Sequence, residues 1–159
     1  MLQMLAKRTF TLDCFAYATN AKCQKFYSKV PSPHSAGINA FQQDWSQEFN
    51  YVCPPVKMII NTIQHILVNP SQGVLVVPYW PSNCFWTILT TDGTHLLEIF
   101  YRHHIFYPRL IHGDLCEPTF FLARARGKML ALFFNSTISI TNTINHSLCL
   151  ESGCMRCNN

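Results

Sequence analysis

The stretch from residue 49 to residue 79 constrains the fold more than any other part of the chain. Residues 56–68 carry apolar side chains at helical spacing, in one stripe made of Val56, Ile59, Ile60, Ile63 and Leu67. The dipeptide Asn69-Pro70 ends this predicted helix. Residues 73–79 form an uninterrupted apolar run, which is typical of a strand buried on both faces of a parallel sheet. Because a shorter strand is predicted at residues 49–53, the order strand, helix, strand indicates a βαβ unit and an α/β fold.

A chain of 159 residues suits one domain, with less regular segments after it. Further strands are predicted at residues 9–15, 96–101 and 128–134. The two prolines and the glycine of residues 30–37 predict a loop. We therefore expect an α/β domain over residues 9–100, an irregular C-terminal extension with one strand over 101–135, and a flexible, cysteine-containing tail over 136–159.

The composition excludes several classes of protein. Only 13% of the residues are charged, about half of the ~25% in typical soluble domains, so a disordered, solvated chain is not expected. The 12 Lys and Arg residues exceed the 8 Asp and Glu residues by four, which is too few for a strongly basic nucleic-acid arm. No apolar run is long enough for a transmembrane helix, and the first ten residues do not read as a signal peptide. We expect an intracellular protein, cytoplasmic or nuclear, with no membrane partner and with its 8 cysteines reduced.

The residues that follow two of the predicted strands are the main candidates for a functional site, since open α/β sheets bind ligands beyond the carboxyl ends of their strands. At the end of the strand at 49–53 and directly after it, these residues are Cys53, Pro54, Pro55 and Val56. The two prolines stiffen the backbone and leave carbonyl oxygens outside the sheet, although they also suit a plain strand end and helix start. Asp13 lies near the end of the strand predicted at 9–15. Its carboxylate would accept hydrogen bonds from a ribose or an amino group, or would cap a turn.

Three sets of residues contain the types that bind metals. A two-metal nuclease would need converging carboxylates, and the candidates are Asp13, Asp44, Glu48 and Asp92. Histidines occur at His103, His104 and His112. Four zinc-ligand types stand within twelve residues of the tail, at His146, Cys149, Cys154 and Cys157. The spacing does not force the acids together, and adjacent histidines on a strand face opposite sides. We expect no metal site. The four residues of the tail remain a candidate, but such a tail is also typical of a frayed terminus.

Basic residues dominate the first thirty positions, where they stand at Lys7, Arg8, Lys22, Lys25 and Lys29. Phe26 and Tyr27 lie among them. The cations could contact a phosphate backbone and the rings could stack on bases, which makes DNA or RNA a candidate partner. The alternative is a solvated rim around an apolar domain.

Several short phrases, taken in order, resemble a known segment. They are DCFA (13–16), TNAKC (19–23), FYS (26–28), NAF (39–41), DWS (44–46), YVCPP (51–55), GVLVVPYW (73–80) and FW (85–86). The order resembles a segment downstream of the reverse transcriptase and ribonuclease H regions of DIRS-like retroelements, and in related tyrosine-recombinase-associated proteins of animals. That segment is itself similar to phage-type Dam DNA adenine methyltransferases. The resemblance covers residues 10–93, with a weaker echo at 129–132.

This resemblance implies a Rossmann-like three-layer α/β sandwich that binds S-adenosylmethionine, with Asp13 near the cofactor. It also implies that residues 53–56 form the catalytic loop, where the family has Asn or Asp, two prolines, and Tyr or Phe. In the family the polar residue and a proline carbonyl hold the adenine amino group, and the ring stacks on the flipped base.

The chain departs from that pattern at both ends of the loop. Cys53 replaces the polar acceptor, and a thiol accepts hydrogen bonds poorly. Val56 replaces the aromatic residue and cannot stack. No glycine-rich cofactor loop is present either. We therefore predict a retroelement-derived, catalytically degenerate methyltransferase-like domain, associated with nucleic acid or with other domains of a retroelement polyprotein. The alternatives are an active adenine methyltransferase and a metal-dependent, ribonuclease-H-like nuclease.

Overall fold

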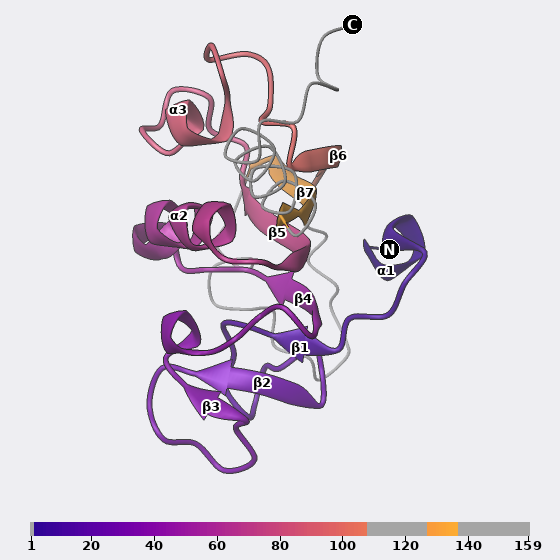
Figure 1. Ribbon diagram of the computed structural model, residues 1–159, viewed down its shortest axis with the longest axis vertical. Helices are drawn as coiled ribbons and strands as arrows, with labels where there is room; N and C mark the ends of the chain where they lie inside the picture. The colour runs from indigo at the N-terminus through magenta and orange to yellow at the C-terminus, as the bar shows by residue number, and fades with distance from the viewer. Residues whose placement is uncertain (1, 108–126, 137–159) are drawn as a thin grey trace, which may run out of the picture.

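A mixed seven-stranded sheet with helices forms the core of the molecule, so the predicted α/β class is confirmed (Figure 1). The computed structural model describes residues 2–107 and 127–136. The strands are β1 (Leu12–Asp13), β2 (Lys25–Ser28), β3 (Gly37–Ile38), β4 (Phe49–Val52), β5 (Gln72–Pro78), β6 (Phe100–Phe106) and β7 (Met129–Asn135). Across the sheet they lie in the order β3-β2-β1-β4-β5-β7-β6.

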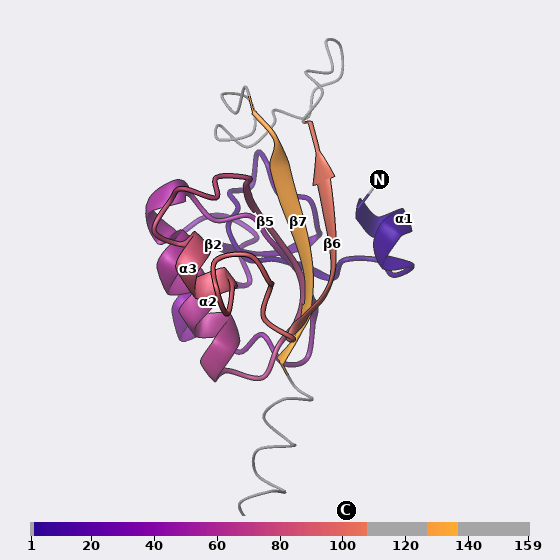
Figure 2. The same ribbon diagram turned by 90° about the horizontal axis from the view of Figure 1, so that it is seen from above.

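The helices lie on both faces of this sheet. They are α1 (Leu2–Ala6), α2 (Ile59–Val68), α3 (Trp86–Leu89) and the 3₁₀ turns η1 (Ala40–Gln42) and η2 (Val56–Met58). Viewed along the sheet, α2 and α3 cover one face, whereas α1 lies on the other (Figure 2). None of the helices in the described ranges has the length and apolar character needed to cross a bilayer.

The predicted βαβ unit is confirmed. Strand β4 pairs in parallel with β5, from Phe49 opposite Gln72 to Val52 opposite Leu75, and η2 with α2 connects the two. The buried stripe of the helix differs from the predicted one, since it consists of Ile59, Thr62, Ile63 and Ile66. Val56 is 37% exposed because it belongs to the 3₁₀ turn, which has a tighter period than the α-helix that follows.

The region beyond residue 100 contributes two strands to the sheet. Strand β7 pairs antiparallel with β5 along all seven residues of each strand, and β6 pairs antiparallel with the far edge of β7. Strand β6 begins at Phe100, later than the strand expected at 96–101, because residues 98–99 form a turn just before it. The segment 101–135, expected to be an irregular extension with one strand, therefore contributes to two strands at one end of the sheet. Strand β7 lies inside the sheet, between β5 and β6.

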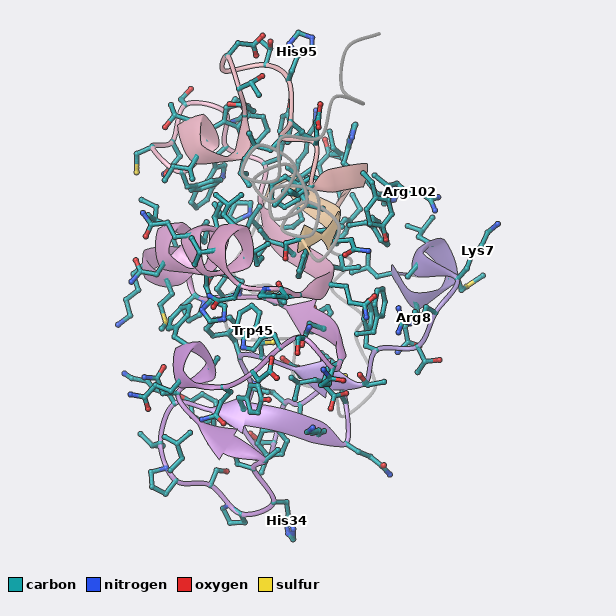
Figure 3. The ribbon with its side chains drawn as sticks, in the orientation of Figure 1. Lys7, Arg8, His34, Trp45, His95 and Arg102 are labelled. Carbon is teal, nitrogen blue, oxygen red and sulfur yellow. The ribbon has the colours of Figure 1, made fainter. Side chains whose placement is uncertain are left out.

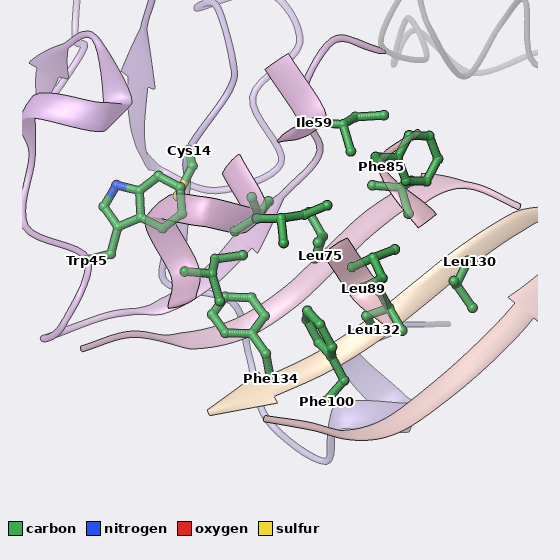
Figure 4. Close-up of a cluster of buried hydrophobic side chains, with 14 of the residues drawn as sticks. Cys14, Trp45, Ile59, Leu75, Phe85, Leu89, Phe100, Leu130, Leu132 and Phe134 are labelled. Atoms are coloured by element: carbon green, nitrogen blue, oxygen red, sulfur yellow. The ribbon is translucent and has the colours of Figure 1, made fainter. Parts of the chain in front are cut away.

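Successive residues of β5 face two separate apolar layers. Leu75 and Val77 pack in the layer under α2 and α3, together with Leu132 of β7 (Figure 4). Val74 and Val76 pack in the opposite layer, which includes Phe133 and the partly buried side chains of α1. Burying each of these aliphatic side chains contributes about 1.5–3 kcal/mol, so the run at 73–79 is strongly specified as the central strand.

Gly73 allows β4 and β5 to approach each other. A Cβ atom at this position would lie 2.2 Å from the backbone oxygen of Asn50 on β4. We expect Gly73→Ala to force the two strands apart and to lower the free energy of unfolding by about 2–3 kcal/mol, measured by urea denaturation. The matched control is Gly127→Ala, because nothing lies within 4 Å of a Cβ atom there. Equal stability of the two variants would contradict the close approach.

Candidate functional site

A cleft of about 330 Å³ opens at the carboxyl ends of the parallel strands. Its lining comes from the segments that follow β1, end β2, follow β3 and follow β4, and comprises Cys14, Phe15, Ala16, Tyr17, Tyr27, Ser28, Lys29, Asn39, Ala40, Pro55 and Met58. The strand order reverses between β1 and β4, because β2 and β3 extend to one side and β5 to the other. Open α/β sheets bind ligands in the crevice at such a reversal.

Asp13 lies at the end of β1, as predicted, but it does not line the cleft. One carboxylate oxygen accepts a hydrogen bond from the backbone N–H of Phe15 (3.2 Å), and the other accepts one from the N–H of Lys22 (3.0 Å). Burial raises the pKa of Asp13, and the two hydrogen bonds oppose that shift. The carboxylate thus fixes the connection from β1 to β2, which carries four residues of the cleft wall.

The four residues of the predicted catalytic loop face different surroundings. Cys53 is buried in the apolar layer on the α1 side, next to Tyr51, and Pro54 is buried as well. Pro55 lines the cleft, but its carbonyl oxygen already accepts a hydrogen bond from Met58 N–H (2.8 Å). Val56 lies outside the lining of the cleft. The loop therefore presents one proline ring to the cleft, and neither the thiol nor the valine.

The thiols around the site are buried and weakly acidic. Burial raises the pKa of Cys53 to about 12, and it raises the pKa of Cys14 well above the ordinary value. The Cys14 thiol donates to the Asn50 side-chain oxygen at 3.6 Å. Cys23, which is half-buried, also has a pKa of about 12 because of burial and the nearby Asp13 charge. These thiols are poor nucleophiles, since the thiolate is the reactive form.

The basic residues and aromatic rings of the first thirty positions do not form one surface. The expectation that both Phe26 and Tyr27 offer open ring faces on such a surface is wrong, although Tyr27 lines the cleft. Both rings are buried, with exposed fractions of 4% and 5%. They belong to the core because β2 lies inside the sheet, between β1 and β3. Lys25, the first residue of β2, forms an ion pair with Glu48.

The other cations are spread over different parts of the molecule. Lys7 and Arg8 lie beside α1, near Arg102, whereas His34, in the loop that also carries Lys29, lies at the far end (Figure 3). The Arg8 guanidinium is 4.7 Å from the centre of the Phe49 ring and donates to the Gln72 side chain. Lys29 alone of the five basic residues lines the cleft.

The acids proposed for a nuclease do not converge on one site, and each has its own partners. Asp44 accepts a hydrogen bond from Ser46 N–H (2.8 Å), Asp92 accepts from Thr94 and His95, and Glu48 pairs with Lys25. Within residues 2–107 and 127–136, no three His, Cys, Asp or Glu side chains are grouped so that they could hold a metal ion.

The histidines and the tail differ in what the structure describes of them. His103 and His104 are neighbours on β6, and His104 stacks on Phe106 at 6.3 Å between ring centres. His112 lies outside the described residues, as do the four tail candidates His146, Cys149, Cys154 and Cys157.

Sequence reasoning missed the wall of the cleft that follows β3. Asn39 has a positive φ of 58°, and its side chain accepts a hydrogen bond from Phe41 N–H at 3.3 Å. This conformation starts η1 and brings Asn39 and Ala40 to the cleft. The one available signal is the residue type, because Asn tolerates the left-handed conformation better than most residues.

Thiol labelling tests the placement of Cys53. In the folded chain at pH 8, a pKa of about 12 leaves about one thiol in ten thousand ionised. We expect iodoacetamide to label the exposed Cys84 at least about 100-fold faster than Cys53 or Cys14, as measured by peptide mass spectrometry. In urea the three cysteines should react at similar rates. Rapid labelling of Cys53 in the folded chain would mean that its thiol faces solvent in the cleft.

Comparison with known proteins gives no information about the chemistry of this cleft. No family model matches the chain, and neither a curated protein nor a solved structure matches it.

Proposed function

We propose that this chain is a retroelement-derived, methyltransferase-like domain that binds an adenosine-containing cofactor and has lost methyl transfer. The observation that carries the proposal is the position of the cleft at the reversal between β1 and β4. From β3 to β5 the strand order is that of Rossmann dinucleotide-binding sheets, which bind their nucleotides at this point. The resemblance of residues 10–93 to the methyltransferase-like segment of DIRS-like retroelements supports the same assignment.

The size and character of the cleft suit a nucleoside. Its volume of about 330 Å³ is at the lower end of the ~300–1,000 Å³ of small-molecule sites. Most of its lining is apolar or aromatic, and the few polar groups include Tyr17 and Asn39. Such a lining accommodates a purine ring and a ribose, and S-adenosylmethionine is the cofactor that the resemblance implies.

The loop after β4 supports the loss of catalysis. An adenine held for methylation needs an acceptor for its amino group and a ring against its face. Cys53 is buried in the layer on the α1 side, and Val56 has no ring. Each missing contact costs about 1–3 kcal/mol, so a flipped adenine would not be held in a reactive position.

Titration calorimetry tests the binding half of the proposal. We expect S-adenosylmethionine to bind with a stoichiometry near one. Tyr17→Ala removes a partly exposed ring from the cleft wall and should weaken binding by about five- to fiftyfold. The matched control is Tyr107→Ala, an exposed tyrosine that follows β6 and is not part of the lining, and it should leave the affinity unchanged. If neither S-adenosylmethionine nor adenosine binds, the cleft is not a cofactor site.

A methylation assay tests the catalytic half. The chain, S-adenosylmethionine and adenine-containing DNA are incubated together, and N6-methyladenine is measured by mass spectrometry. We expect none above the level without protein, because the loop lacks both contacts. Formation of N6-methyladenine that depends on the chain would establish an active methyltransferase, in which a proline carbonyl suffices to hold the amino group.

A further inference from the structure

The charge of the cleft favours a ligand that carries a negative charge. Among the described residues that line it, Lys29 is the only one with a charged side chain. No carboxylate is in the lining, and Asp13 uses both of its oxygens on backbone N–H groups. A ligand in this cleft therefore meets a cation and no anion.

Lys29 lies at the strand end beside which Rossmann sheets hold the nucleotide ribose. It follows Ser28 directly, at the carboxyl end of β2. In Rossmann sheets an acidic residue near this place accepts hydrogen bonds from the ribose 2′-hydroxyl, whereas a nearby cation accommodates a phosphate on that oxygen. This chain has the cation and lacks the acid.

The backbone that carries Lys29 is fixed by hydroxyl groups. The Ser28 hydroxyl donates to the Val30 carbonyl oxygen (2.7 Å) and lies 2.9 Å from the Ser35 hydroxyl. Ser35 in turn donates to the Gly37 carbonyl oxygen at 2.7 Å, on the first residue of β3. These contacts tie the two ends of the connection from β2 to β3, so the position of Lys29 at the cleft is set by the fold.

Lys29 is also available for a ligand. No hydrogen bond or ion pair joins its ammonium group to another residue of the described ranges. Lys25, at the start of the same strand, is instead paired with Glu48. A phosphate carries about 1.5 to 2 negative charges at neutral pH, which a lysine at this place would partly neutralise.

We propose that the cleft also binds nucleotides whose ribose carries a phosphate on its 2′ or 3′ oxygen, and that it binds them more tightly than the unphosphorylated nucleoside. The inference rests on the proposed function for the nucleoside part of the ligand, and it adds the phosphate and the residue that contacts it.

Calorimetry with four ligands tests this proposal: adenosine, adenosine 2′-monophosphate, adenosine 3′-monophosphate and adenosine 5′-monophosphate. We expect the 2′- or the 3′-monophosphate to bind about three- to tenfold more tightly than adenosine, as for one partly solvated charged contact. The gain should shrink as salt is raised. The 5′-monophosphate should show no gain, because no cation lines the part of the cleft that follows β1.

Two lysine variants complete the test. Lys29→Gln should remove the gain and leave adenosine binding unchanged, whereas Lys128→Gln, which changes an exposed lysine outside the lining, should keep the gain. A gain that survives in Lys29→Gln, an equal gain for the 5′-monophosphate, or no gain at all would each overturn the phosphate proposal. In those cases adenosine still binds, so the proposed function stands. If none of the four ligands binds, both proposals fail.

Discussion

The rest of the sheet depends on the central position of β5. One edge of this strand pairs with β4 from Gln72 to Leu75, the other pairs with β7 along its whole length, and its two faces meet the two apolar layers. The paired edges satisfy most of its backbone groups, and the two layers remove its apolar side chains from water, which fixes its register strongly. Because β4 is aligned against β5, the end of β4 and the start of η2 are fixed with it. Pro55 and Met58 owe their place at the cleft to that alignment.

The other wall of the cleft depends on a polar contact instead. Parallel strands are usually joined by a crossover of a dozen or more residues that contains a helix, but residues 14–24 join β1 to β2 without one. The buried carboxylate of Asp13 organises this connection from inside, since it accepts hydrogen bonds from two N–H groups nine and two residues away. A buried carboxylate is costly unless it is hydrogen-bonded. Here the same bonds offset that cost and shape the loop, so a residue that does not line the cleft determines its form.

The sequence predicted the parts of the fold in which local pattern and tertiary packing agree. Residues 49–79 and the strand at 128–134 have continuous or periodic apolar patterns, and the structure confirms them. Strand β2 was not predicted, because its three buried residues, Phe26, Tyr27 and Ser28, are consecutive and do not alternate. Strand β6 carries Arg102, His103 and His104 at the edge of the sheet, where polar residues are tolerated and leave little signal.

For the site, too, features that depend on neighbouring residues in the sequence could be predicted, and features that depend on tertiary structure could not. The place of Asp13 and Pro55 at strand ends follows from the sequence, because a strand end is a local feature. Which loop residues converge does not, since the cleft combines segments that are brought together only by the order of strands β3, β2, β1 and β4. The direction of the Cys53 side chain, toward the layer on the α1 side, also depends on the register of β4.

The position of β7 has a consequence during synthesis on the ribosome. Strand β7 is the last described strand to be made, yet it lies inside the sheet, between β5 and β6. Residue 129 is translated about 50 residues after the end of β5, which takes roughly 3–10 s at ~5–20 residues per second. For an interval of that length after it emerges, β5 presents an unpaired apolar edge, and β6 has no strand to join. Such edges promote association between chains, so the nascent protein is most exposed to aggregation in the interval between the emergence of β5 and the arrival of β7.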